Sequence, residues 1–167
     1  MGIHGDLIDS EHEGGSMEGS NEKSKPHRKI LIATDGSKAS EKAANFGIEI
    51  ARLSGAKIYA IYVIDITYYD SILMDKTWKK EEYKRFEKIG HIATSFVEET
   101  AKSVGVEAES ILLKGNPAEK IADFAEKQKV DMIVVGSLGK SGIERFVLGS
   151  VSGKVVRHAK VPVLVVR

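Results

Sequence analysis

The sequence predicts an α/β fold, an open and doubly wound five-stranded parallel sheet with helices on both faces. Five short apolar segments, most of them rich in Val and Ile, lie at residues 30–33, 58–64, 108–113, 132–135 and 161–166. They lack the polar alternation of a half-exposed strand, as is typical of strands buried on both faces of a parallel sheet. Helical patterns separate them, and this alternation with right-handed crossovers favours the doubly wound arrangement.

Four intervening helices are predicted from apolar residues that recur every three or four positions. The third has a clear start, because Asn116 can cap a helix, Pro117 suits its first turn and Glu119 can reach back. The fourth is expected to start near Gly149. The positions expected on the buried helix faces are Ala43, Phe46, Gly47, Ile50, Ala51 and Ser54, then Phe86, Ile89, Ala93, Phe96, Val97, Thr100, Ala101 and Val104, then Ile121, Ala122, Phe124 and Ala125, and finally Val151, Val155 and Val156.

The chain divides into a tail, residues 1–28, and one domain, residues 29–167. With 167 residues it is long enough for one well-buried domain. The tail is rich in Gly, Ser, Glu and His and cannot bury enough surface to offset its ordering entropy, so we expect it to be disordered. Residues 1–22 carry six acids and no Lys or Arg, and since the whole chain stands at +1, the remainder carries +7. A basic domain could favour an anionic ligand, although scattered solvated lysines explain this charge equally well.

The composition excludes several kinds of protein. The chain has no cysteine, which rules out disulfides, thiolate metal sites and thiol catalysis. Its apolar runs are too short to span a bilayer, and its N-terminus lacks the basic start and apolar run of a secretory signal. There is no dense basic stripe with interleaved aromatic residues. We therefore expect a soluble, cytoplasmic protein with neither a membrane nor a nucleic acid as partner.

The glycine-rich segment at residues 135–152 contains Gly-Lys-Ser at 139–141, the ending of a Walker A phosphate loop. A Walker A loop with this ending would need glycine at position 134, where Val134 stands, and would follow the first strand rather than the fourth. The glycines at 136, 139 and 142 also fail the G-x-G-x-x-G spacing of a dinucleotide fingerprint. Both familiar phosphate motifs are therefore rejected.

The remaining pattern is Gly136-x2-Gly139-x9-Gly149-Ser150, a phosphate loop in two halves. The first two glycines end a buried strand and would let the backbone approach a ligand without Cβ interference. The second half stands at the start of the last helix, where unpaired N–H groups and the helix dipole suit a phosphate. The hydroxyls of Ser150 and Ser152 can donate there as well. The alternative is that these glycines only make turns.

Asp35 directly follows the first strand and is the second candidate, because ligands of doubly wound sheets sit beyond the carboxyl ends of strands where the strand order reverses. It could accept hydrogen bonds from a ribose hydroxyl or an adenine amine, or help hold Mg²⁺ through an outer-shell water. It could equally cap the first helix, as could Ser37 or Ser40. Residues 65–82 are either a lid over a ligand or an irregular start of the second helix.

Taken together, "KILIATDGS" on the first strand, "IYVID" closing the second and the two-part glycine pattern resemble the universal stress protein family, in its ATP-binding subclass. The resemblance covers residues 28–167. It implies a Rossmann-like fold of the adenine nucleotide alpha-hydrolase type. It also implies ATP as ligand, with AMP or ADP as alternatives and Mg²⁺ or Mn²⁺ bound through the phosphates, and a homodimer that pairs through the last strand.

The resemblance further implies which residues bind the nucleotide. The first strand would lie against the adenosine with Asp35 near the ribose, the end of the second strand would offer backbone contacts to adenine, and the two glycine segments would border ribose and phosphates. Many relatives have Pro where this chain has Ala33, whose small side chain should preserve the pocket. The implied binding residues are Ala33, Thr34, Asp35, Val63, Val135, Gly136, Gly139, Gly149, Ser150, Val151 and Ser152.

Three functions remain open. The first is a nucleotide-binding regulatory or stress-response protein with slow or no hydrolysis, the second an ATPase or an adenylyl or phosphoryl transferase, and the third a ligand-free dimeric interaction module. Efficient hydrolysis needs a residue that positions water and a cation for the developing charge. Lys140 and Arg145 could supply charge, and His91 and His158 have no identifiable carboxylate partner. No catalytic residue and no protein metal ligand is predicted.

Overall fold

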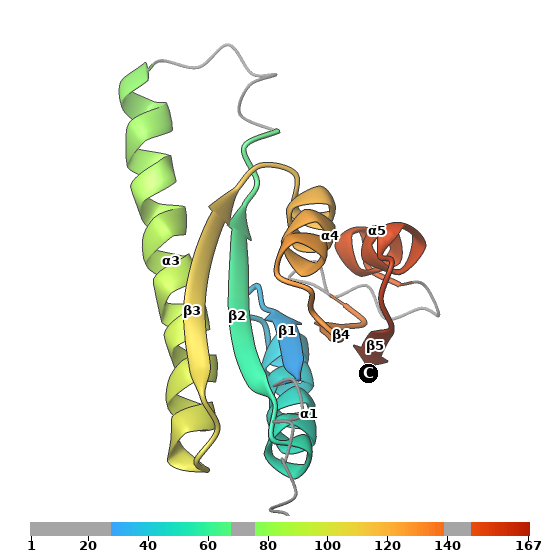
Figure 1. The fold of residues 1–167 in the computed structure, drawn as a ribbon. Helices are drawn as coiled ribbons and strands as arrows, with labels where there is room; N and C mark the ends of the chain where they lie inside the picture. Colours follow the sequence, from blue (N-terminus) through green and yellow to red (C-terminus); the bar gives the residue numbers. More distant parts are fainter. Residues whose placement is uncertain (1–27, 68–75, 139–147) are drawn as a thin grey trace, which may run out of the picture.

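Residues 28–67, 76–138 and 148–167 are described by the computed structural model, and they form a five-stranded parallel sheet that confirms the predicted fold class (Figure 1). The strands are β1 (Lys29–Ala33), β2 (Lys57–Ile64), β3 (Ala108–Lys114), β4 (Met132–Gly136) and β5 (Val163–Val166). The helices are α1 (Lys38–Ser54), α3 (Lys76–Ser103), α4 (Pro117–Lys127) and α5 (Ser150–His158).

The strand order reverses next to β1, in the middle of the sheet. The order across the sheet is β3-β2-β1-β4-β5, so the chain runs outward from β1 to β3 and then crosses back to β4 on the other side. Every strand pair is parallel, which brings all carboxyl ends to the same edge. The reversal therefore lies between the carboxyl ends of β1 and β4, where doubly wound sheets bind their ligands.

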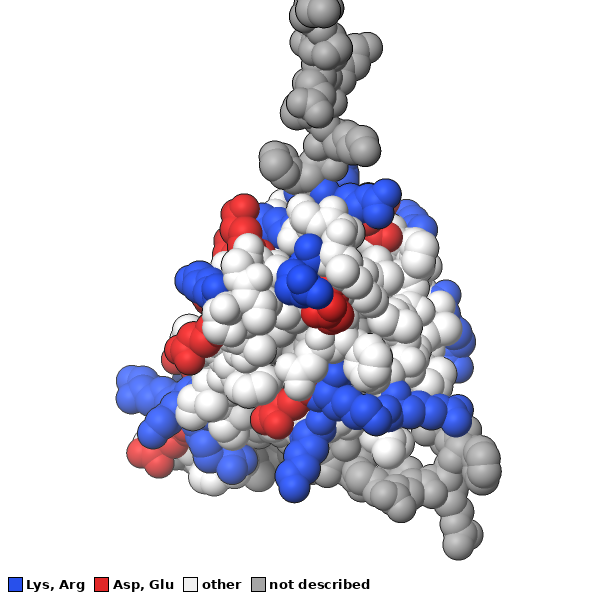
Figure 2. Space-filling model, turned by 90° about the horizontal axis from the view of Figure 1, so that it is seen from below, with Lys and Arg blue, Asp and Glu red and all other residues white. Residues whose placement is uncertain are grey.

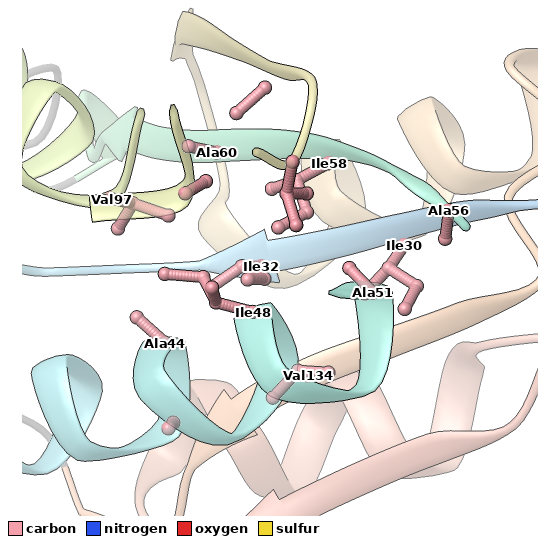
Figure 3. Packing of buried hydrophobic residues seen from close by; sticks show 14 of the residues in the cluster. Ile30, Ile32, Ala44, Ile48, Ala51, Ala56, Ile58, Ala60, Val97 and Val134 are labelled. Atoms are coloured by element: carbon pink, nitrogen blue, oxygen red, sulfur yellow. The ribbon is translucent and has the colours of Figure 1, made fainter. Parts of the chain in front are cut away.

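Strand β1 is covered by helices on both faces, which explains why its sequence lacks polar alternation. Ile30 and Ile32 belong to the core under α1, together with Val97 of α3 (Figure 3). Leu31 lies between them in sequence and belongs to the core of the opposite face, with Ile121 of α4. These three β1 side chains are at most 3% exposed. Helices α1 and α3 thus cover one face of the sheet, and α4 and α5 cover the other (Figure 1).

Polar side chains cap the N-termini of α1 and α4. The hydroxyl of Ser37 accepts a hydrogen bond from the N–H of Ser40 at 3.2 Å, so Ser37 rather than Asp35 is the N-cap of α1. The alternative that Asp35 caps this helix is therefore wrong. Asn116 caps α4 as predicted, because its side-chain oxygen accepts from the N–H of Ala118 at 3.1 Å.

The buried helix faces are narrower than the periodicity predicts. Ala43, Gly47 and Ala51 of α1 are buried as predicted, and so is Val155 of α5. Several larger side chains lie on the flanks of their helices or beyond the helix end, where the sheet does not cover them. The prediction was wrong for Phe46 (53% exposed), Phe96 (39%), Val104 (46%), Val151 (37%) and Val156 (43%).

Helix α3 starts at Lys76, well before Phe86, the first position predicted for it. Its first turns consist largely of Lys, Glu and Arg, which favour helix without needing a buried face. These turns extend past the carboxyl edge of the sheet (Figure 1). Of residues 65–82, predicted as a lid or an irregular helix start, residues 76–82 are regular helix. Residues 65–67 are described, and residues 68–75 lie outside the described residues.

Charged side chains of both signs are present on the face that is seen from below in the view of Figure 1 (Figure 2). Lys57 of β2 lies 3.1 Å from a carboxylate oxygen of Glu107 and 3.0 Å from one of Glu109. Hydrogen bonds to Glu109 and then Glu107 raise the pKa of Lys57 to about 12. This pairing favours scattered lysines over a concentrated anion-binding surface at the start of β2. None of the described helices is long and apolar enough to cross a membrane.

Candidate functional site

A cavity of about 390 Å³ opens at the carboxyl edge of the sheet, at the reversal between β1 and β4. The ends of β1, β2 and β4 and the starts of α4 and α5 surround it. Ten of the eleven predicted binding residues line this cavity, and Gly139, the eleventh, lies outside the described residues. The ten are Ala33, Thr34, Asp35, Val63, Val135, Gly136, Gly149, Ser150, Val151 and Ser152.

The turn from β1 into α1 forms one polar wall of the cavity. Asp35 is half-buried, and its Oδ1 accepts a hydrogen bond from the N–H of Ser37 at 3.0 Å. Gly36 has a φ of 76°, in the left-handed region that glycine adopts readily. The hydroxyl of Thr34 has a partner in α1, because it lies 3.1 Å from the hydroxyl of Ser40. Thr34 and Ser40 are uncharged, so Asp35 is the residue of this wall that contributes a charge.

Glycine at position 136 is explained by a close contact with α1 and not by the approach of a ligand that the glycine pattern predicts. A Cβ at Gly136 would lie 3.0 Å from the carbonyl oxygen of Ala39 and 3.2 Å from the nitrogen of Ser40. The space that the missing side chain frees is thus occupied by the first turn of α1. The sequence predicts that glycine at 136 leaves space for a ligand. In the structure, the absence of a side chain instead allows β4 to pack closely on α1.

The start of α5 forms another wall of the cavity, and among the described residues no side chain pairs with its first backbone donors. Gly149 is its N-cap, and no side chain caps the helix. The N–H of Gly153 donates to the carbonyl of Gly149 at 2.8 Å, so the N–H groups of residues 150–152 precede the first bond of the helix. The positive end of the α5 dipole lies here as well. This wall can therefore bind an anion without a positively charged side chain.

Ser152 does not have the role that its sequence position predicts. Its side chain is 6% exposed, and its hydroxyl donates to the carbonyl of Gly149 at 3.0 Å, with the carbonyl of Ser137 at 3.3 Å. The Ser137 carbonyl also accepts from the N–H of Gly149, and the Ser137 N–H donates to the carbonyl of Val166 in β5. Ser152 thus ties α5 to the end of β4, while Ser150 is exposed at the rim.

An apolar wall was largely missed by the sequence reasoning. Only four apolar residues of this wall were predicted, namely Ala33, Val63, Val135 and Val151. The position of Val63 at the carboxyl end of β2 could also have indicated its neighbours Ile61 and Tyr62. Phe86 was expected only as part of a helix core; it packs against the cluster of Tyr62, Ile64 and Ala93 and also lines the cavity. The further lining residues are Ser40, Ile61, Tyr62, Asp65, Phe86, Pro117, Ile121 and Leu138.

The charged residues of the described lining are both acidic. Asp35 and Asp65 lie in the wall, and Lys, Arg and His are absent from the lining within the described ranges. The described residues also contain no group of three or more His, Cys, Asp or Glu that could hold a metal ion. His91 and His158 are exposed and do not line the cavity. Lys140 and Arg145 lie outside the described residues.

Solved structures of related proteins share this fold. The hypothetical protein MJ0577 is similar with a TM-score of 0.73 and 28% identity, over 84% of this chain and 95% of that protein. A universal stress protein of Archaeoglobus fulgidus, solved in complex with dAMP, has a TM-score of 0.60 and 26% identity, over 84% of this chain and 98% of its own.

The sequence comparisons give the family. The universal stress protein family matches residues 26–167. A universal stress protein of Methanocaldococcus jannaschii is 41% identical over 147 residues, which cover 84% of this chain and 82% of that relative. The chain belongs to the universal stress protein family, as the resemblance of its motifs predicted.

Proposed function

We propose that the carboxyl-edge cavity binds an adenine nucleotide, ATP together with Mg²⁺ or Mn²⁺, and that the protein is a stress-response regulator. The observation that carries this proposal is the position of the cavity at the strand reversal, with a carboxylate on one wall and helix donors on another. A related protein of the same family binds dAMP, which supports an adenine nucleotide as the ligand class.

The two polar walls suit the two polar ends of a nucleoside phosphate. Asp35, which follows β1, can accept hydrogen bonds from the ribose hydroxyls. The N–H groups of residues 150–152 can donate to phosphate oxygens. Ile61, Val63 and Ile121 provide an apolar surface for the base. Gly139 is included as a phosphate-side residue on the basis of the two-part glycine pattern alone.

The same lining argues for slow or no hydrolysis. Efficient phosphoryl transfer needs charge stabilisation and a group that orients the attacking water. The described lining supplies carboxylates and helix donors but no Lys, Arg or His. A divalent cation held by the phosphates would therefore neutralise most of the ligand's charge. The described lining therefore favours a binding protein over an ATPase or a transferase.

The proposal also includes a homodimer formed through β5 and a cytoplasmic location. Strand β5 is the last strand of the sheet and pairs only with β4 within the described part of the chain. An unpaired strand edge readily pairs with another copy. The absence of cysteine suits a reducing compartment.

The test is to purify the protein under native conditions, denature it and identify the released nucleotide by chromatography, together with a titration of ATP and Mg²⁺ into nucleotide-free protein. We expect bound adenine nucleotide, and at least tenfold weaker binding for Gly149→Val with an unchanged circular dichroism spectrum. Wild type that is empty and also fails to bind added ATP contradicts the proposal. Release of ADP in place of ATP, with steady turnover of added ATP, favours the enzyme instead.

A further inference from the structure

Four polar residues at the start of α1 are joined by hydrogen bonds that the binding proposal does not use. Thr34 and Ser40 are buried, at 7% and 4% exposure, and their hydroxyl oxygens lie 3.1 Å apart. The hydroxyl of Ser40 donates to the carbonyl of Ser37 at 2.8 Å, so its one hydrogen is already used. The hydroxyl of Thr34 therefore donates to Ser40, which gives the pair a defined direction.

The same oxygen of Thr34 also accepts. The N–H of Gly36 donates to it at 3.2 Å, which holds the left-handed turn that follows β1. The next N–H, that of Ser37, donates to Oδ1 of Asp35 at 3.0 Å. Ser37 in turn accepts from the N–H of Ser40 as the helix cap. The hydrogen bonds thus run from the buried hydroxyl pair, through the turn, to the carboxylate in the cavity wall.

The turn is also fixed from the other side of the reversal. The backbone of Gly136, at the end of β4, lies against Ala39 and Ser40, so close that a Cβ would approach the Ala39 carbonyl oxygen to 3.0 Å. The first turn of α1 is therefore held between the hydroxyl of Thr34 and the end of β4. A buried network whose members are all paired limits the conformations that its side chains can adopt.

We propose that the buried Thr34–Ser40 hydroxyl pair is a positioning element that sets the carboxylate of Asp35 for recognition of ribose hydroxyls. This rests on the proposed nucleotide function. Thr34 then acts through Asp35 and not by contact with the ligand. We expect its effect on the sugar and not on the phosphates, because the donors proposed for the phosphates come from α5, a different element of the lining.

The binding test compares ATP with 2′,3′-dideoxy-ATP, both with Mg²⁺, by calorimetry. We expect wild type to bind ATP about tenfold or more tightly than the dideoxy analogue, as for a hydrogen bond to a charged group. Asp35→Asn and Thr34→Val should each lose most of this preference while keeping their affinity for the dideoxy analogue. Thr34→Ser, which keeps the hydroxyl, should restore the preference.

Thr94→Val is the matched control, because Thr94 is 1% exposed and its hydroxyl donates within α3, to the carbonyl of Gly90 at 3.0 Å. It removes a buried hydroxyl whose hydrogen bonds stay within α3 and should leave the ratio of the two affinities unchanged. If Thr34→Val weakens both ligands equally, or changes neither, the positioning role is wrong.

Amide hydrogen exchange of the nucleotide-free protein separates this inference from the proposed function. We expect the Ser37 N–H, which donates to Asp35 and not to Thr34, to exchange at least tenfold faster in Thr34→Val than in wild type. Unchanged exchange at Ser37 overturns the inference even if nucleotide binds. If wild type binds no nucleotide, the proposed function fails, and exchange at Ser37 still decides whether Thr34 positions Asp35.

Discussion

The α-carbon of Gly136 faces the carbonyl group of Ala39 so closely that a Cβ at this position would lie 3.0 Å from the carbonyl oxygen. The contact joins the end of β4 to the first turn of α1. Both elements contribute residues to the cavity lining, so we expect their packing to affect the shape of the cavity. Glycine at position 136 is therefore part of the site even without a direct contact to the ligand.

Gly136→Ala is expected to lower the free energy of unfolding by about 1–3 kcal/mol, because the added methyl group must displace backbone rather than a flexible side chain. It should also weaken ATP binding, since the turn that carries Asp35 has to move. Chemical denaturation and calorimetry measure the two effects. Gly153→Ala is the control: its Cβ would meet that of Leu148 at an ordinary 3.6 Å, so we expect equal or slightly higher stability.

Ser150→Glu separates helix stability from ligand binding. Ser150 is exposed in the first turn of α5, where a carboxylate interacts favourably with the helix dipole by roughly 0.3–1 kcal/mol. The same charge repels phosphates, so we expect an unchanged or higher melting temperature together with at least tenfold weaker ATP binding. Ser150→Gln is the neutral control and should bind nearly as wild type does. Equal loss in both variants would contradict an anion site at this helix end.

Val165→Pro tests the proposed dimer. The carbonyls of Pro162 and Val166 accept hydrogen bonds from the β4 side, so the alternate residues Val163 and Val165 direct their N–H groups to the open edge. Proline at 165 removes an edge donor and leaves the β4 pairing intact. We expect a folded monomer by light scattering after gel filtration. Leu164→Pro, in the opposite phase, should destabilise the fold, and a folded Val165→Pro dimer would rule out pairing through β5.

Lys57→Met tests the ion pairs that join β2 to the edge of the sheet at Glu107 and Glu109. The pKa of Lys57 is raised to about 12, so its contribution is complete below its unfolded value of 10.5 and is lost as the pH rises through 12. At pH 8 the substitution should cost roughly 0.2–1 kcal/mol, as for partly exposed pairs. Urea unfolding at pH 8 and pH 12 measures it, and the difference from wild type should shrink at the higher pH. Lys57→Arg should resemble wild type at pH 8.

The fold could be predicted from the sequence because each central strand is buried on both faces, and β1 shows this in five residues. Ile30 and Ile32 face α1 while Leu31 faces the other layer, so the three positions that follow Lys29 are all apolar. The widths of the helix faces could not be predicted in the same way. Phe46 has the spacing of the buried positions of α1 but is 53% exposed. The spacing of apolar residues shows which side of a helix faces the sheet, but not how much of that side the sheet covers.

The candidate site was predictable where a residue follows a strand or starts a helix, as with Asp35 and Ser150. The individual roles were not, because they depend on partners far away in the sequence. Ser152 could have faced a ligand, but its hydroxyl is used by Gly149 and Ser137. Phe86 was expected to pack in a helix core, and it does contact the cluster of Tyr62, Ile64 and Ala93, but its place in the cavity lining depends on the end of β2, about 20 residues earlier in the sequence.

The hydrogen bond from the N–H of Ser137 to the carbonyl of Val166, at 2.7 Å, has a consequence for the order of events during synthesis. The carboxylate of Asp35 leaves the ribosome early, whereas the partner that holds Ser137, and through it Gly149, is made about 130 residues later. A nascent chain would therefore carry Asp35 long before the start of α5 is anchored. If the cavity binds a nucleotide as proposed, that ligand would stabilise only the finished domain.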